Sequence, residues 1–203
     1  MISFQKRFLF VHIPKTAGNS IQSVLRDHSE DELLALRSEQ DGVERFGLRN
    51  PKYKTKKHST LAEYREALGN EQFRSLYKFT CVRNPWDRMV SYYFTPTQKV
   101  TAWDPKKFRK VISRALSVAE YLQLDKVEGD PFGNVDYVMR FENLAGDFRT
   151  VCAALDISPT TLPQYNRSNR EHYSKYYDDE LRELVRERFD AEIDRFGYVF
   201  EQP

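Results

Sequence analysis

Cysteine is scarce in this sequence, and no pair of cysteines is spaced for a metal site. The 203 residues include two cysteines, Cys81 and Cys152, which lie far apart and outside any CxxC pattern. Because no cluster of cysteine and histidine occurs, a zinc site is not expected. Both cysteines lie in apolar segments, so we expect two buried free thiols and no requirement for an oxidising compartment.

Long hydrophobic runs are also missing. The first apolar segment, residues 8–13, is too short to span a bilayer, and no small-residue cleavage site follows it. We therefore interpret this segment as a buried strand. A soluble, cytoplasmic protein is expected unless a membrane anchor lies outside this sequence.

Neither positive nor negative residues are in large excess. Lys and Arg number 32 against 30 Asp and Glu, which gives a formal net charge of +2. Dedicated nucleic-acid binders usually carry a large basic excess, so no nucleic-acid partner is expected. Hydrophobic residues make up 40% and aromatic residues 14% of the chain, which is enough for a core. The length suits one domain, which we expect to span residues 1–203.

Apolar periodicity predicts strands that alternate with helices. The expected strands are residues 8–13, 77–82 and 135–141. The expected helices begin near Asn19 and Pro85 and cover residues 61–68, 106–124 in one or two pieces, 144–155 and 181–193. Residues 37–58 predict a loop with little regular structure, and residues 198–200 a short strand or an apolar plug. This alternation favours an α/β, P-loop-like fold of three layers, with a central, mostly parallel sheet flanked by helices.

The first candidate site lies between the first strand and the first helix, at residues 12–20. A turn from a buried strand into a helix points backbone N–H groups and the positive end of the helix dipole at one spot. Ala17 and Gly18 leave room for a ligand to approach closely, and Lys15 adds a positive charge. Further side-chain donors are Thr16, Asn19 and Ser20. The segment therefore predicts a site for a terminal phosphate or sulfate.

This segment is not a Walker A motif. Lys15 precedes Gly18 instead of following the glycines, and no clear Walker B aspartate follows a later apolar strand. An ordinary kinase or NTPase is therefore disfavoured. The alternative is a plain strand–helix turn with a solvated Lys15, and the loop by itself does not decide between the two. Its position after a buried strand favours the functional interpretation.

A second strand–turn–helix unit, residues 78–93, repeats this plan. The strand is expected to end at Arg83, and Pro85 then starts a helix that carries Ser91. Arg83 would lie at the carboxyl edge of the sheet, where ligands of open α/β sheets bind. Since an arginine can hold a phosphate through two hydrogen bonds, Arg83 predicts a second anion site.

The arginines of this unit also have a structural alternative. Arg83 and Arg88 could each pair with Asp87 or Glu142. We assign that structural role to Arg88 and the ligand role to Arg83. The aromatic side chains nearby are expected in the core first, with an acceptor pocket or adenine stacking as the alternative: Trp86, Tyr92 and Tyr93.

The two segments HIPKTAGNS and VRNPWDRMVSYY together resemble the motifs of the type 2 and carbohydrate sulfotransferases. These enzymes use 3′-phosphoadenosine-5′-phosphosulfate as the sulfate donor. The likeness continues in order through residues 57–60, 140–144 and 173–200, so it covers most of the chain.

The resemblance implies roles for individual residues. It implies that the loop Lys15–Ser20 holds the 5′-phosphosulfate and that Arg83 and Ser91 hold the 3′-phosphate. It also implies that a late loop closes on the nucleotide, which adds Arg167 and Ser168. The usual loop has threonine where this chain has Asn19, and asparagine can still donate a hydrogen bond, so donor binding should survive.

The implied reaction moves a sulfuryl group in line to a hydroxyl or amine acceptor, for which a carbohydrate is expected. Lys15 would neutralise charge on the leaving phosphate, and no metal is expected. Among the histidines, His58 is preferred as general base because it matches a lysine–histidine position of the family. His12 ranks second and Glu63 third, whereas His28 and His172 are expected at the surface.

Other functions remain open from the sequence. A nucleotide-binding module without catalysis would keep the loop and lack a working base, and a phosphoryl-transfer enzyme would depend on magnesium. The lysines in residues 52–57 and 106–110 suggest an anionic acceptor, although ordinary solvated faces explain them equally well.

Overall fold

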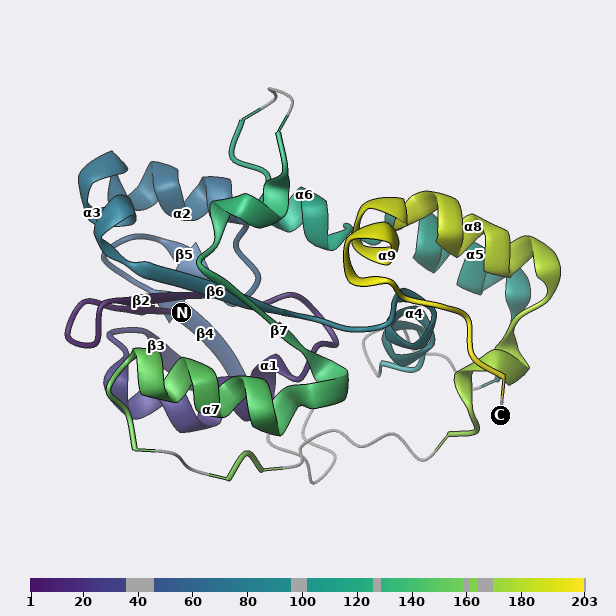
Figure 1. Ribbon diagram of the computed structural model, residues 1–203, viewed down its shortest axis with the longest axis horizontal. Coiled ribbons are helices and arrows are strands. Elements are labelled where there is room, and N and C mark those ends of the chain that lie inside the picture. Colours follow the sequence, from purple (N-terminus) through teal and green to yellow (C-terminus); the bar gives the residue numbers. More distant parts are fainter. Residues whose placement is uncertain (36–45, 96–101, 126–128, 159–160, 164–169, 203) are drawn as a thin grey trace.

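The computed structural model describes residues 1–35, 46–95, 102–125, 129–158, 161–163 and 170–202. Its central feature is a sheet with the strand order β1-β2-β6-β7 (Figure 1). The strands are β1 (Ile2–Ser3), β2 (Phe8–Val11), β6 (Tyr77–Val82) and β7 (Tyr137–Arg140). β2, β6 and β7 run parallel, and β1 pairs antiparallel with β2. The carboxyl ends of the three parallel strands therefore meet at one edge.

Helices cover both faces of this sheet, which confirms the expected mixed α/β architecture. Figure 1 shows α1 (Gly18–Leu25) and α7 (Leu144–Ala154) on one face. The other face carries α2 (Leu61–Leu68), α3 (Asn70–Ser75) and α6 (Val118–Leu122). Beyond the carboxyl edge lie α4 (Pro85–Tyr93), α5 (Pro105–Arg114), α8 (Asp179–Arg188) and α9 (Asp190–Phe196).

The alternation of side chains along β2 builds two cores. Phe8 and Phe10 belong to a cluster with residues of α1 and α7. Leu9 and Val11 belong to a second, larger cluster on the other face of the sheet. Because successive strand residues point to opposite faces, one short apolar run supplies both layers. All four side chains are fully buried, as expected for a central strand.

A second, antiparallel sheet of three strands corrects the prediction of a loop over residues 37–58. It consists of β3 (Glu32–Ala35), β4 (Phe46–Asn50) and β5 (Thr55–Lys56). The prediction was wrong for residues 46–50 and 55–56, while residues 37–45 lie outside the described part of the chain. These strands are two to five residues long, and the register pairs Arg49 with Lys56. No apolar alternation in the sequence marks such strands.

Several helix boundaries also differ from the predictions. The expected helix 181–193 is broken at Phe189 into α8 and α9, because Phe189 leaves the helical conformation at φ −124°. The apolar spacing continues across this break, so periodicity does not reveal it. Residues 106–124 form two helices, and Ser117 caps the second through a capping box with Glu120. Helix α3 begins at Asn70, where the sequence predicted an end.

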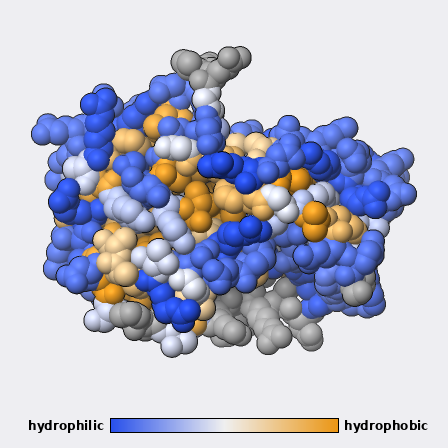
Figure 2. Space-filling view, in the orientation of Figure 1, coloured by the Kyte–Doolittle hydropathy of each residue, from blue (hydrophilic) through white to orange (hydrophobic). Residues whose placement is uncertain are grey.

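The surface is mostly hydrophilic. On the face in Figure 2, apolar side chains gather over the middle of the molecule, and both ends are hydrophilic. Within the described residues, no helix combines the length and the apolar character that a membrane span needs. Cys81 and Cys152 are buried and free, as expected. Tyr198 is buried against the core at the end of the chain without forming a strand, so it acts as the apolar plug.

Candidate functional site

The turn between β2 and α1 has an unusual backbone. Lys15 (φ 71°) and Ala17 (φ 66°) both adopt the left-handed conformation, although neither is glycine. Each such residue costs roughly 1–2 kcal/mol, and strain of this kind concentrates at ligand sites. Left-handed residues in a tight turn aim successive N–H groups into a shared concavity that suits an anion. This strained backbone conformation is therefore of the kind that suits an anion.

The helix that follows the turn keeps its N-terminus open. Its N-cap residue, Ala17, makes no side-chain capping hydrogen bond, and the first turn of α1 contains no acidic residue. The N–H groups of a first helical turn lack partners within the helix and carry the positive end of its dipole. Asn19 is half-buried and Ser20 is buried in this turn. An anion is the natural partner for such an end.

Two lysines bring positive charge to this turn. Lys15 is half-buried within it, and Lys57 approaches from the end of β5. The pKa of Lys57 is lowered to about 8, first by burial and then by the charge of Lys15. Lys52, Lys54 and Lys56 are exposed, so Lys57 alone of these lysines faces inward. A bound anion near the two lysines would relieve their repulsion.

Thr16 and Gly18 serve the loop itself. The Thr16 side chain is fully buried, and its hydroxyl donates to the Ile13 carbonyl oxygen over 2.9 Å. A Cβ atom at Gly18 would lie 2.0 Å from Nε2 and Cδ2 of His12. The space beside Gly18 is thus filled by the His12 ring, which corrects the expectation that this space is open to a ligand. The part of the loop that a ligand could contact is therefore its backbone N–H groups.

The rings of His12 and His58 meet edge to face under the loop. His58 Nδ1 donates to the His12 carbonyl oxygen over 2.9 Å, and the ring centroids are 4.5 Å apart. Because a carbonyl only accepts, the His58 proton sits on Nδ1 and Nε2 is the basic nitrogen. His12 Nδ1 lies 2.9 Å from the Gln22 Oε1 atom, which accepts its hydrogen bond.

Both rings are held neutral at pH 7. Burial lowers the pKa of His12 well below its usual range, and the neighbouring His58 and Lys57 add to this effect. The pKa of His58 is lowered to about 4, mainly by burial, although its hydrogen bond to His12 acts in the opposite direction. The His58 side chain is exposed, so solvent can reach it. A neutral imidazole of this kind can accept a proton.

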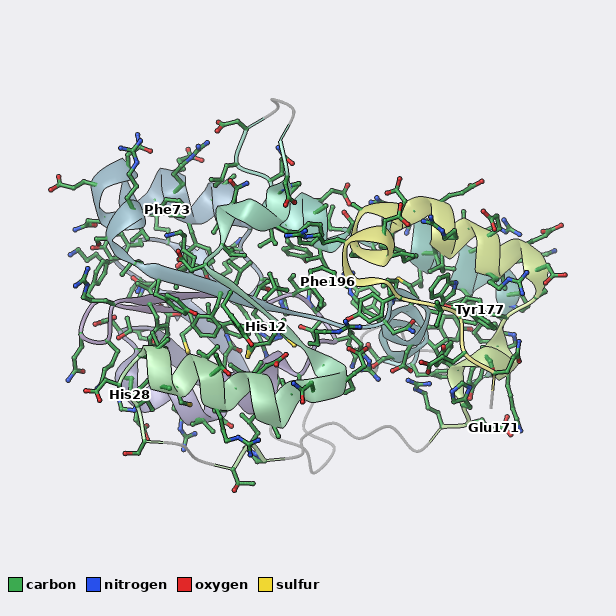
Figure 3. All side chains as sticks on the ribbon, in the orientation of Figure 1. His12, His28, Phe73, Glu171, Tyr177 and Phe196 are labelled. Atoms are coloured by element: carbon green, nitrogen blue, oxygen red, sulfur yellow. The ribbon has the colours of Figure 1, made fainter. Side chains whose placement is uncertain are left out.

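The remaining histidines lie elsewhere. Figure 3 shows His12 near the centre of the molecule and His28 at its edge. His172 is half-buried, and its Nδ1 atom lies 2.9 Å from the Ser174 hydroxyl in a short turn. Neither His28 nor His172 contacts the loop through any bond among the described residues.

Arg83 connects the second motif to the first. Its NH1 group donates to the Lys15 carbonyl oxygen over 3.1 Å. Its Nε and NH2 groups lie 2.8 and 2.5 Å from Asp87 Oδ2, and its guanidinium lies 4.0 Å over the Phe141 ring. The pairing with Asp87 is the structural alternative that the sequence left open. The contact with Lys15 is new, and it brings the two predicted anion sites together.

Arg170 is a residue that the sequence analysis missed. It pairs with Asp87 Oδ1, so one carboxylate holds two guanidinium groups. Burial acts to raise the pKa of Asp87, but Arg83 and Arg170 outweigh it and lower the pKa overall. No spacing in the sequence links Asp87 to a residue so distant. Arg167 and Ser168, predicted just before Arg170, lie outside the described residues.

Arg88 has the structural role expected of it, with a different partner. Its side chain is 2% exposed and lies 3.5 Å from the Glu192 carboxylate, in place of Asp87 or Glu142. It also donates to the carbonyl oxygens of Pro14 (3.3 Å) and Leu116 (2.7 Å). Arg88 therefore supports the loop from behind.

The other residues of α4 are buried or half-buried. Trp86 and Tyr93 are buried in the larger core, and the Trp86 indole donates to the Arg182 carbonyl oxygen over 3.0 Å. Tyr92 is half-buried, and Ser91 is buried on the same helix.

Across the described segments, no cluster of histidine, cysteine and acidic side chains is arranged to hold a metal ion.

The family comparison agrees with this geometry. Residues 1–199 match the family model described as Sulfotransferase family. This match covers nearly all of the chain, so the chain belongs to the sulfotransferase family. Sulfuryl transfer is the reaction of that family, which places the chain among the transferases. The comparisons with curated proteins and with solved structures returned no match.

Proposed function

We propose that this chain moves a sulfuryl group from 3′-phosphoadenosine-5′-phosphosulfate to a hydroxyl or amine of a carbohydrate acceptor. The observation that carries the proposal is the loop itself. Two left-handed residues, Lys15 and Ala17, precede an uncapped helix N-terminus, and Arg83 is fastened to the same loop. A nucleotide with an anionic group at each end of its ribose suits two anion sites that lie this close.

The donor would lie across both motifs. The N–H groups of Lys15–Ser20 and the Lys15 ammonium would hold the 5′-phosphosulfate. Arg83 and Ser91 would hold the 3′-phosphate, with Arg83 sharing its guanidinium between that phosphate and Asp87. Arg167 and Ser168 are proposed as further contacts from the late loop. The proposed contacts are cations, amides and hydroxyls, which fits an anionic nucleotide without a metal clamp.

His58 is proposed as the general base. Its Nε2 atom would take the proton from the acceptor hydroxyl as the acceptor oxygen forms its bond to sulfur. The bond between sulfur and the oxygen of the 5′-phosphate breaks in the same step, and adenosine 3′,5′-bisphosphate leaves. Lys15 would neutralise the charge that grows on that leaving oxygen. His12 would hold His58 in the required tautomer through its carbonyl oxygen.

Two measurements test the proposal. Adenosine 3′,5′-bisphosphate should raise the melting temperature of the chain more than ADP does. Label from a sulfur-35 donor should then appear in at least one member of a panel of carbohydrate, phenol and amine acceptors. A larger shift with ADP, or magnesium-dependent phosphate transfer, would identify a phosphoryl-transfer enzyme instead. Stabilisation without transfer to any acceptor would identify a binding module.

A further inference from the structure

A cavity opens directly behind the loop. Its volume is about 130 Å³, and it lies where α4, the end of α5 and α6 meet the loop. The residues that shape it include Pro14, Arg88, Tyr92, Arg114, Leu116 and Tyr121. A cavity of roughly 150 Å³ is known to hold one benzene ring. This cavity therefore has the volume of a single six-membered ring and is too small for a long segment of a polymer.

The cavity borders the loop at Pro14, the residue before Lys15. Arg88 fixes this wall, because its Nε group donates to the Pro14 carbonyl oxygen over 3.3 Å and its NH2 group donates to Leu116 over 2.7 Å. A ring in the cavity would thus lie against the loop, next to the residue that precedes Lys15. This placement suits the second substrate of a transfer reaction more than a remote regulator.

The charges around the cavity are not balanced. The charge of Arg88 is offset by Glu192, which lies 3.5 Å away and is buried with it. Arg114, at the end of α5, is exposed at the mouth, and no carboxylate of the described residues lies within ion-pair distance of it. One guanidinium at the mouth is therefore available to an anionic group on a ligand.

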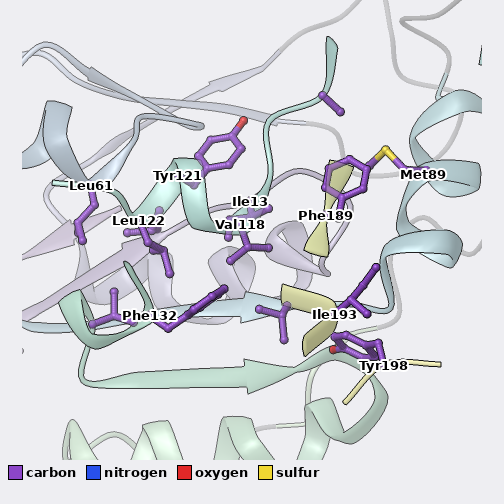
Figure 4. Packing of buried hydrophobic residues seen from close by; sticks show 14 of the residues in the cluster. Ile13, Leu61, Met89, Val118, Tyr121, Leu122, Phe132, Phe189, Ile193 and Tyr198 are labelled. Atoms are coloured by element: carbon purple, nitrogen blue, oxygen red, sulfur yellow. The ribbon is translucent and has the colours of Figure 1, made fainter. Parts of the chain in front are cut away.

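Aromatic and apolar surface completes the lining. Tyr121 is 8% exposed, and Figure 4 shows its ring at the edge of the core cluster, with the hydroxyl directed away from Leu122 and Val118. Tyr92 and Arg88 are both close enough to Tyr121 to affect the pKa of its hydroxyl, which burial raises. Leu116 is 40% exposed, one of few large apolar side chains so open among the described residues. Tyrosine faces and an exposed leucine suit the apolar face of a ring.

We propose that this cavity is the acceptor subsite and that it takes one six-membered ring carrying a carboxylate and a hydroxyl, with the carboxylate on Arg114. The proposal rests on the proposed sulfotransferase function for its chemistry, and on the cavity alone for its binding. A sugar ring and a phenol ring can both carry a carboxylate and a hydroxyl, so the experiment includes one pair of compounds of each kind.

The test is binding to the full chain by saturation-transfer NMR titration, without donor. Methyl β-D-glucuronoside is compared with methyl β-D-glucoside, and 4-hydroxybenzoate with 4-hydroxybenzamide, so that each pair differs in charge and little in shape. In at least one pair the carboxylate should bind more tightly than its neutral partner. Arg114→Gln should weaken binding of that carboxylate by about tenfold or more, as expected for a charged hydrogen bond, and leave the neutral partner unchanged.

Two further variants separate the cavity from general charge. Lys110→Gln removes one positive charge one turn away on the same helix, at a residue that does not line the cavity, and should change the affinity for neither member of a pair. Leu116→Trp should block the mouth and weaken both members of a pair. Equal loss with Lys110→Gln and Arg114→Gln would overturn the proposal, as would the absence of binding in both pairs. Displacement of the carboxylate by adenosine 3′,5′-bisphosphate would overturn it too, because the cavity would then belong to the donor.

Turnover distinguishes failure of this inference from failure of the proposed function. If carboxylate rings bind with the expected dependence on Arg114 but no labelled sulfate is transferred and adenosine 3′,5′-bisphosphate gives no stabilisation, the proposed function fails and the anion subsite stands. If sulfate is transferred and Arg114→Gln leaves the KM of charged and neutral acceptors unchanged, the subsite assignment fails and the proposed function stands.

Discussion

The Arg83 guanidinium donates a hydrogen bond to the carbonyl oxygen of Lys15 across 68 residues of sequence, over 3.1 Å. Two strand–turn–helix units thereby share one bond at the carboxyl edge of the sheet. The two segments in which the sequence predicts separate anion sites are thus in direct contact.

Arg83→Gln should reveal which phosphate Arg83 serves. We expect the affinity for adenosine 3′,5′-bisphosphate to fall by roughly 10- to 100-fold, the value of a hydrogen bond to a charged group, and the affinity for AMP to change much less. Isothermal titration of both ligands measures the difference. Arg74→Gln, a change to an exposed arginine of α3, is the matched control. Equal losses for the two ligands would mean that Arg83 acts only by holding the loop.

Lys57 should impose a pH dependence on anion binding. Its pKa is lowered to about 8 in the free protein, so the loop loses positive charge as the pH rises through that value. We expect the affinity for adenosine 3′,5′-bisphosphate to decline between pH 7 and pH 9. In Lys57→Arg the charge persists, so this decline should be much smaller. An unchanged profile in that variant would exclude Lys57 as its source.

His58→Gln should separate binding from chemistry. The variant removes the basic Nε2 atom, and loss of a general base typically costs about 10²–10⁴-fold in rate. Thermal stabilisation by adenosine 3′,5′-bisphosphate should persist, because His58 contacts the His12 carbonyl oxygen and not the loop amides. The measurements are kcat with labelled donor and the ligand-induced shift in melting temperature. Unchanged kcat would rule His58 out and favour His12.

The lowered pKa values of the buried His12 and of the exposed His58 should make the fold sensitive to mild acid. Their pKa values are lowered in the folded protein, that of His58 to about 4, so the unfolded chain binds more protons below about pH 6.5. The free energy of unfolding should therefore fall as the pH drops from 6.5 towards 4.

Urea unfolding at pH 7, 6 and 5 measures this dependence. In His12→Gln the slope between pH 7 and pH 5 should be shallower than in the parent, whatever the stability at pH 7. His28→Gln, outside the pair, should retain the parent slope. A parent whose stability does not change over this range would contradict the burial of neutral imidazoles.

Gly18→Ala should destabilise the fold by about 1–3 kcal/mol, the usual cost of overpacking. The new methyl group would overlap the His12 ring. Gly133→Ala is the control, because a Cβ atom there meets nothing within 4 Å. Chemical denaturation compares the two, and adding His12→Ala to Gly18→Ala should recover part of the loss. Equal stability of Gly18→Ala and Gly133→Ala would show that the ring moves aside without cost.

Local signals in the sequence were enough for the elements that carry the site. Thr60 and Glu63 predict a capping box, and the predicted bounds of α2 agree with the structure. The apolar run at Phe8 and the proline at Pro85 likewise place β2 and α4. These features depend on neighbours in sequence, so the sequence displays them directly.

What the sequence did not reveal depends on residues far apart. The meeting of Arg83 and Arg170 on Asp87 joins two chain segments whose spacing follows no rule. The partner of Arg88 came from α9 for the same reason. Strands β3 to β5 are short and form by pairing with one another, which the pattern within one segment does not indicate. Tertiary packing, and not propensity, decides such features.

The contact of the His12 ring with Gly18 has a consequence for how this protein can change. Gly18 belongs to the donor loop, and the carbonyl oxygen of the same His12 orients His58. The proposed donor loop and the proposed general base therefore both depend on the position of His12. A substitution at His12 should therefore disturb the packing of the loop and the position of His58 together, whereas the residues that line the cavity include neither histidine.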